Sequence, residues 1–305
     1  MIADLSKRYE WLDTLTVNSD DPKLSAMDRA RVAYVTLMKE FVSGAVFNEA
    51  ERSVNARLAH KHKLTFRRFD IEARKNGRDW AYLGDTMTGW ARLDNVRDLV
   101  IDVIKNGIEG DYIEAGAWRG GSSMFARAVL YAYGESNRKS FVCDSFQGLP
   151  AGDRMLDKED KGWDQVAYLE VAAEIVLQNF QKYSLLDPNV IFAKGFFNET
   201  MPALSKRIDK LSVMRLDGDM YESTVDVLYN LYDKLSIGGY VIMDDWNGYP
   251  SKTACDDFFS VHGFQPEIIA IDKMSAYWKK TEQVDIQYWR YQQNKFKNGE
   301  SNART

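Results

Sequence analysis

The chain has 305 residues, of which 45% are hydrophobic and 28% charged, so it suits one large α/β domain with additions and is not a mainly disordered protein. Its net charge of −5 disfavours a nucleic-acid backbone as a partner. The charged N-terminus and the lack of a long apolar run predict a cytoplasmic protein without a signal peptide or membrane span. The two cysteines, Cys143 and Cys255, are expected to be buried thiols and not a disulfide framework.

The first 90 residues are expected to form a helical N-terminal extension that serves as a lid or in oligomer formation, because no strand signal stands out among them. A helical pattern of apolar residues ends at Gly44, where a glycine can close the helix. The basic segment 52–68 is expected to be the solvated face of a further helix, and the alternative is that it binds an acidic partner.

Residues 91–290 are expected to form the main domain, and residues 291–305 a polar tail. Strand and helix patterns alternate from Asp111 onward, which is typical of a parallel sheet with helices on both faces. The candidate strands are 112–115, 140–143, 190–193, 213–216, 240–243, 267–271 and 275–279, and the candidate helices lie near 123–133, 164–182, 223–235 and 252–262. The sequence therefore predicts an α/β fold with a doubly wound, seven-stranded, mostly parallel sheet, in which ligands bind beyond the C-terminal ends of the strands. The polar segment 151–162, which follows the second strand, is expected to be either a lid over the acceptor site or a solvated loop.

The first candidate strand leads into a glycine-rich turn and the start of a helix. Gly116, Gly120 and Gly121 allow backbone geometry that other residues avoid, and Ser122 or its neighbour can cap the helix. Such a turn brings main-chain N–H groups against a ligand, and Glu114 at the strand end would repel a pyrophosphate but accept from an amine or a ribose hydroxyl. These features favour S-adenosylmethionine over NAD, and a plain connection between strand and helix is the alternative.

The next two strand ends carry further candidate contacts of the cofactor. Asp144 and Ser145 follow the second strand, where a carboxylate can accept both ribose hydroxyls of an adenosine. Gly195, Phe196 and Phe197 follow the third strand and give room and aromatic surface for the adenine, although ordinary core packing explains them equally well. Together with the glycine turn, these residues predict a site for a cofactor that contains adenosine.

Aspartates follow the fourth and fifth candidate strands, with Asp217 and Asp219 after one and Asp244 and Asp245 after the other. Carboxylates that converge at neighbouring strand ends repel one another unless a cation is bound or some of them are protonated. Oxygen ligands alone indicate a hard ion, and the expected water and substrate ligands favour Mg²⁺ over Ca²⁺, with Mn²⁺ as the alternative. The other explanation of the aspartate pair is that it caps a loop or a helix.

Several motifs together resemble one family of enzymes. In chain order they are Gly77-Arg78-Asp79-Trp80, Thr86-Met87-Thr88-Gly89, Ala91-Arg92-Leu93-Asp94-Asn95, Glu114-Ala115-Gly116-Ala117-Trp118-Arg119-Gly120-Gly121, Asp144-Ser145-Phe146, Leu216-Asp217-Gly218-Asp219-Met220-Tyr221-Glu222-Ser223-Thr224, Gly239-Tyr240-Val241-Ile242-Met243-Asp244-Asp245 and Tyr277-Trp278. With these motifs the chain resembles the macrocin O-methyltransferase family, which includes the mycinamicin and novobiocin sugar O-methyltransferases. Its members are metal-dependent enzymes that use S-adenosylmethionine.

The resemblance implies roles for individual residues. It implies that Asp217, Asp244 and Asp245 bind the metal and that Asp217 is also the general base. The cofactor contacts that it implies are Thr86, Met87, Glu114, Ala115, Gly116, Ala117, Ser122, Asp144 and Ser145. It further implies a seven-stranded sheet with an added helical N-terminal region, and assembly into dimers or larger homo-oligomers.

The chemistry expected of these residues is methyl transfer to a hydroxyl. A sugar or alkyl hydroxyl is a poor nucleophile at neutral pH, and a cation together with a carboxylate can activate it. Three aspartates that hold Mg²⁺ would leave positions for two adjacent substrate oxygens, so the expected small-molecule acceptor is a vicinal diol, in a sugar or in a catechol-like ring. Resemblance alone favours the sugar.

Two other classes of protein are alternatives. A nicotinamide-dependent dehydrogenase would share the sheet, but its turn needs the spacing Gly-x-Gly-x-x-Gly, and the paired aspartates would be unexplained. A non-catalytic protein that binds S-adenosylmethionine would keep the cofactor turn and have no reason to keep the metal cluster. Dependence of any turnover on a divalent metal separates these classes from the methyltransferase.

Overall fold

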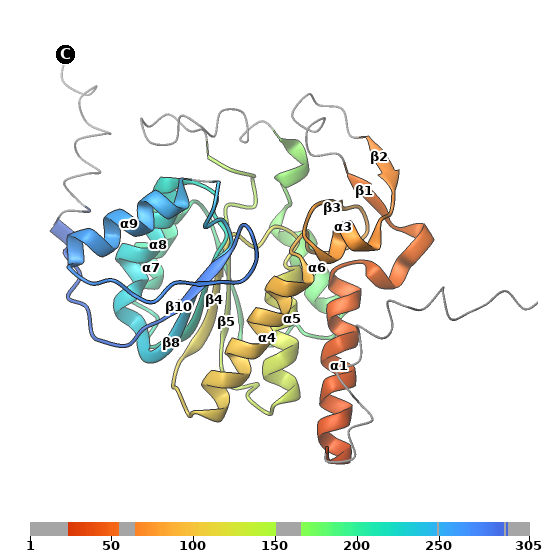
Figure 1. Cartoon of the computed structure of the whole chain (residues 1–305), viewed down its shortest axis with the longest axis horizontal. Helices are drawn as coiled ribbons and strands as arrows, with labels where there is room; N and C mark the ends of the chain where they lie inside the picture. Colours follow the sequence, from red (N-terminus) through yellow and green to blue (C-terminus); the bar gives the residue numbers. More distant parts are fainter. Residues whose placement is uncertain (1–23, 55–64, 151–165, 249, 290, 292–305) are drawn as a thin grey trace, which may run out of the picture.

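The computed structural model of the protein describes residues 24–54, 65–150, 166–248, 250–289 and 291, and its centre is a seven-stranded sheet (Figure 1). Its strands, in their order across the sheet, are β6 (Val190–Lys194), β5 (Ser140–Asp144), β4 (Asp111–Ala115), β7 (Leu211–Leu216), β8 (Leu235–Met243), β10 (Ala276–Lys279) and β9 (Ile269–Ala270). The first five are parallel, and β10 is antiparallel to both of its neighbours. All seven candidate strands are therefore confirmed, and so is the mostly parallel sheet.

Helices cover both faces of this sheet. One face carries α4 (Trp90–Lys105), α5 (Gly121–Ala132) and α6 (Ala173–Lys182), with α1 (Ala26–Val42) packed against α5, and the other face carries α7 (Phe197–Leu204), α8 (Tyr221–Leu231) and α9 (Ser251–His262) (Figure 1). Short 3-10 helices lie at Ala45–Ala50, Ala167–Leu169 and Tyr232–Lys234. Each face has its own apolar core, with Phe125 and Phe180 in one and Leu228 and Phe258 in the other.

The helices expected between the strands are present, with two differences. The helix expected over 164–182 is α6, which begins at Ala173, and a 3-10 helix precedes it. The sequence did not predict α7, which has eight residues and contains Pro202. An eight-residue helix shows only two turns of apolar periodicity, and an internal proline is normally a sign against a helix.

The N-terminal region is not entirely helical, which corrects the expectation for the first 90 residues. It contains a three-stranded antiparallel sheet, in which β1 (Arg52–Val54) lies between β2 (Phe66–Arg68) and β3 (Trp80–Ala81), and a short helix, α3 (Ile71–Lys75). The basic segment expected as a helix thus supplies two of these strands. Strands of two or three residues are too short to show the polar and apolar alternation that identifies a strand in a sequence.

Some expectations concern residues outside the described ranges. The segment 151–162, expected as a lid or a loop, is one of them, and the polar tail 291–305 is another except for Tyr291. In the part of the chain that the structure describes, no helix has the length and apolar character needed to cross a membrane.

Candidate active site

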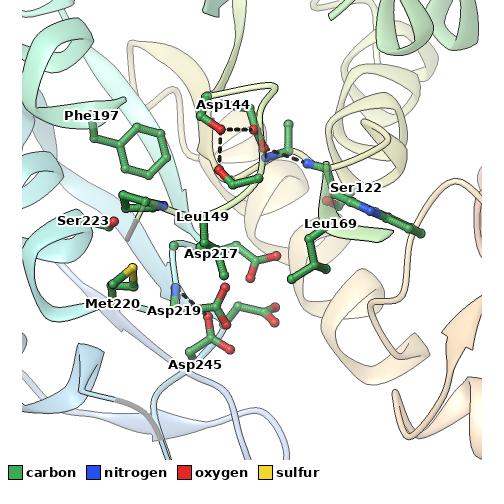
Figure 2. A pocket seen from close by; sticks show the side chains of 18 of the residues that line it. Ser122, Asp144, Leu149, Leu169, Phe197, Asp217, Asp219, Met220, Ser223 and Asp245 are labelled. Carbon is green, nitrogen blue, oxygen red and sulfur yellow. Dashed lines mark hydrogen bonds between the residues drawn. The ribbon is translucent and has the colours of Figure 1, made fainter. Parts of the chain in front are cut away.

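A cavity of about 640 Å³ opens beyond the C-terminal ends of β4, β5, β7 and β8, where the sequence placed the ligand site (Figure 2). Most of the predicted site residues line it: Thr86, Met87, Gly116, Ala117, Ser122, Asp144, Ser145, Phe196, Asp217, Asp244 and Asp245. Three others, Glu114, Ala115 and Gly195, are not among its lining residues. The structure therefore brings most of the predicted cofactor residues and all three predicted metal ligands into one cavity.

Gly116 joins the cofactor side of the cavity to the acidic side. It follows β4 with φ of +100°, and a Cβ atom built on it would lie 1.7 Å from the backbone oxygen of Asp217. The N–H of Asp217 donates to the Ala115 carbonyl (2.8 Å) and holds the two segments together, and the N–H of Gly116 donates to the Cys143 carbonyl (2.8 Å) and ties the turn to β5. Only a glycine fits a position with both this backbone angle and this close approach.

Asp144 shapes the glycine turn and also faces the cavity (Figure 2). Its carboxylate accepts hydrogen bonds from the backbone N–H groups of Ala117 (2.9 Å), Trp118 (3.0 Å) and Phe146 (2.7 Å). Burial raises the pKa of Asp144, and these hydrogen bonds oppose the rise because they favour the ionised form. Trp118 and Phe146 both have positive φ, so the carboxylate stabilises two residues in an unfavourable backbone conformation.

Glu114 is fully buried and contacts the first residues of the helix that follows the glycine turn. Its carboxylate forms an ion pair with the guanidinium of Arg215 and accepts hydrogen bonds from the hydroxyls of Ser122 and Ser123. Burial raises the pKa of Glu114, and Arg215 lowers it in opposition. Glu114 thus contacts Arg215, Ser122 and Ser123, and of these four residues only Ser122 lines the cavity.

Three aspartates form the acidic side of the cavity, and one carboxylate oxygen from each lies within 4.8 Å of the other two: Asp217 after β7, and Asp244 and Asp245 after β8 (Figure 2). Burial and the neighbouring Asp244 raise the pKa of Asp217 to about 7. Burial and the charges of Asp219, Asp217 and Asp244 raise the pKa of Asp245 well above its usual range. Crowding of like charges therefore makes full ionisation of this group costly.

Two arginines compensate part of this charge, and neither was predicted as a site residue. Arg215 is fully buried and pairs with Asp217 (Nη1 to Oδ2, 2.8 Å) and with Asp244. Arg92 pairs with the second oxygen of Asp244 (2.5 Å) and with Asp272 (2.7 Å). Although burial acts in the opposite direction, these two arginines lower the pKa of Asp244.

The donor set fits a divalent cation. Asp245 accepts a hydrogen bond from the backbone N–H of Asp219 (3.2 Å), and among the described residues it forms no salt bridge. Arg92 and Arg215 pair with Glu114, Asp217, Asp244 and Asp272. A cation among the three aspartates would favour the ionised forms of Asp217 and Asp245, whose pKa values are raised without one. Hard oxygen ligands of this kind suit Mg²⁺ or Mn²⁺.

Of the remaining wall residues, the sequence named Phe197, together with Phe196, as aromatic surface for the adenine. Others that were not predicted as site residues include Trp80, Trp118, Leu149, Pro150, Leu169, Asn198, Met220, Glu222, Ser223, Asp226 and Met274. Arg215 could have been predicted to form an ion pair, because a charged residue within a wholly buried strand needs a charged partner. No local signal marks Met274 or Leu169, which reach the cavity from distant parts of the chain.

Comparison with known proteins gives the family. The model of the family described as "Macrocin-O-methyltransferase (TylF)" matches residues 31–280. Demethyldecarbamoylnovobiocin O-methyltransferase of Streptomyces niveus is 40% identical over 256 residues, which are 81% of this chain and 93% of that protein. The 8-demethyl-8-(2,3-dimethoxy-alpha-L-rhamnosyl)-tetracenomycin-C 4'-O-methyltransferase of Streptomyces olivaceus is 38% identical over 255 residues, covering 83% of this chain and 94% of that protein.

A solved structure agrees with these relatives. The O-methyltransferase NovP matches with a TM-score of 0.74 and 39% identity, over 83% of this chain and 100% of that chain. The fold is that of the class I S-adenosylmethionine-dependent methyltransferases, as predicted. The family match begins within α1 and ends after β10, so it includes the whole seven-stranded sheet and every described wall of the cavity. The chain belongs to the macrocin O-methyltransferase (TylF) family.

Proposed function

We propose that the protein is an S-adenosylmethionine- and Mg²⁺-dependent O-methyltransferase that methylates one hydroxyl of a vicinal diol, in a sugar of a natural product. The observation that carries the proposal is the contact between Gly116 and Asp217, by which the glycine turn lies directly beside a cluster of three aspartates in one cavity. A sugar acceptor is supported by the relative from Streptomyces olivaceus, whose name describes a rhamnosyl compound.

The cofactor would bind on the side of the glycine turn. Gly116 and Ala117 present the turn to the cavity, and Asp144 and Ser145 lie at the end of the adjacent strand β5, where a carboxylate can accept from ribose hydroxyls. Phe196 would contact the adenine, and Thr86 and Met87 would cover the cofactor from the N-terminal side. Glu114 would act on the cofactor through Ser122, whose hydroxyl it orients.

The acceptor would bind on the acidic side. Asp217, Asp244 and Asp245 would hold the divalent cation, which when bound polarises an acceptor hydroxyl and favours its deprotonation. Asp217 would take the proton, because Arg215 fixes its Oδ2 atom and a positioned carboxylate can act as a general base. Most of the acceleration would come from charge and from alignment of the hydroxyl with the methyl group.

We expect S-adenosylmethionine and S-adenosylhomocysteine to bind this cavity in the micromolar range, which corresponds to about −8 kcal/mol. The physical reason is that the turn offers backbone N–H groups and a carboxylate, and lacks the glycine spacing of a pyrophosphate site. Titration calorimetry with both compounds and with NAD measures this directly. Micromolar binding of NAD without binding of either sulfur compound would contradict the proposal.

A further inference from the structure

The segment 81–84 leads from β3 to the part of the chain that covers the cavity, and a buried carboxylate binds its backbone donors. Glu51 is fully buried. Its Oε1 atom accepts from the N–H of Tyr82 (2.7 Å) and of Leu83 (3.0 Å), and its Oε2 atom accepts from the N–H of Gly84 (2.8 Å). Three consecutive amide groups thus point to one side chain, and the segment cannot shift without breaking charge-assisted hydrogen bonds.

The backbone acceptors of the same segment are bound by Arg119, which comes from the glycine turn. Its Nη1 atom donates to the carbonyls of Tyr82 (2.8 Å) and Gly84 (2.9 Å), with the carbonyl of Ala81 slightly farther away (3.3 Å). The guanidinium also lies over the ring of Trp118, 4.3 Å from its centroid. Arg119 therefore ties the N-terminal region to the turn that would bind the cofactor.

Residues 85–87 follow this segment and reach the cavity. The carbonyl of Asp85 accepts from the N–H of Gly121 at the start of α5 (2.9 Å), and its carboxylate accepts from the hydroxyl of Tyr183 (2.6 Å). Thr86 and Met87 follow directly, and both line the cavity. Segment 81–84 and Asp85 therefore join the N-terminal region to the glycine turn immediately before these two residues.

We propose that Arg119 and Glu51 are positioning residues for cofactor binding, although neither lines the cavity. Arg119 fixes segment 81–84 to the glycine turn from one side and Glu51 fixes it from the other, so that Thr86 and Met87 stay over the cofactor. The inference rests on the proposed function, because it assumes that the cofactor lies against this turn. It predicts that loss of Arg119 weakens cofactor binding and leaves the acidic side of the cavity intact.

The test compares Arg119→Met with the wild-type protein, with Arg119→Lys and with Arg97→Met as a matched control. Methionine keeps the apolar stem and removes the donors, and lysine keeps one charged donor. Arg97 lies on α4 and forms ion pairs with Asp94 and Asp98, away from the cavity. Three quantities are measured: the affinity for S-adenosylhomocysteine by calorimetry, the KM for S-adenosylmethionine together with kcat, and the hydrogen exchange of the peptide that contains residues 81–89.

We expect Arg119→Met to weaken S-adenosylhomocysteine binding by roughly tenfold, with Arg119→Lys between it and the wild type. The KM for S-adenosylmethionine should rise in parallel, while kcat at saturating cofactor and the KM for the acceptor stay near the wild-type values. Exchange of the peptide 81–89 should accelerate in Arg119→Met and not in Arg97→Met.

Two outcomes would overturn the inference. One is an affinity for S-adenosylhomocysteine in folded Arg119→Met within about twofold of the wild type, since a factor of two is far below the effect of losing these hydrogen bonds. The other is a fall in kcat with unchanged cofactor affinity. If the wild-type protein itself does not bind S-adenosylhomocysteine, the proposed function fails, and this result is distinct from a failure of the positioning role. Glu51→Gln supplies an independent variant, because its amide would face three backbone N–H groups and should weaken cofactor binding in the same way.

Discussion

Replacing Asp217 by Asn is expected to lower turnover by a factor of roughly 10² or more, with little change in cofactor affinity. The asparagine keeps the size of the side chain and an oxygen that can still accept from Arg215, whose Nη1 atom lies 2.8 Å from Oδ2 of Asp217. It removes the negative charge and the base that takes the proton from the acceptor hydroxyl. Rates of transfer of a labelled methyl group give the turnover, and calorimetry gives the affinity.

Asp245→Asn and Asp244→Asn are the matched controls for this variant. Both should also lose activity, but excess Mg²⁺ should partly restore it, because these residues would hold the ion without taking the proton. Asp245 is the cleaner control, since Asp244 also pairs with Arg92 and Arg215. If excess Mg²⁺ restored Asp217→Asn as fully as Asp245→Asn, Asp217 would be a metal ligand without a role as base.

Replacing Gly116 by Ala is expected to lower the free energy of unfolding by more than about 4 kcal/mol, at the upper end of single substitutions. Its Cβ atom would lie 1.7 Å from the backbone oxygen of Asp217, where neither partner is a flexible side chain end. Gly107→Ala separates this clash from the cost of the backbone angle, because Gly107 has φ of +64° and no heavy atom within 4 Å of the built Cβ. That control should lose roughly 1 kcal/mol.

Urea-induced unfolding gives the free energy of unfolding of both glycine variants. If Gly116→Ala were no less stable than Gly107→Ala, the close approach of the two segments would not exist in solution. The contact between the cofactor turn and the acidic cluster would then lose its structural basis.

The main sheet could be predicted from the sequence because its strands carry their own signals. In strands such as β8 (Leu235–Met243), the last four residues are all buried and form a short apolar run, Tyr-Val-Ile-Met. The convergence of Asp217, Asp244 and Asp245 could be predicted for a related reason: parallel strands end at the same edge, so residues after β7 and β8 must meet. Neither inference needs knowledge of a distant contact.

The partner of Glu114 could not be predicted from local sequence, and its contact with the cofactor stays a prediction. In the sheet Glu114 lies directly beside Arg215 of β7, and the two residues form a buried ion pair. This register depends on which strand lies next to β4, and the sequence of β4 does not contain that information. For the same reason Arg92 and the small N-terminal sheet were not predicted, since long-range contacts define both.

Transfer of a labelled methyl group from S-adenosylmethionine to a sugar hydroxyl, measured on metal-free protein with and without added Mg²⁺, tests the central claim most directly. Demethyldecarbamoylnovobiocin and other glycosides with adjacent free hydroxyls serve as candidate acceptors, since the former gives its name to the relative from Streptomyces niveus. The proposed function predicts no transfer after treatment with a chelator, saturable recovery as Mg²⁺ is added, and an intact fold throughout, because the sheet and helices have apolar cores of their own. Equal transfer with and without the divalent ion would contradict the metal-dependent mechanism and leave the three aspartates with a structural role.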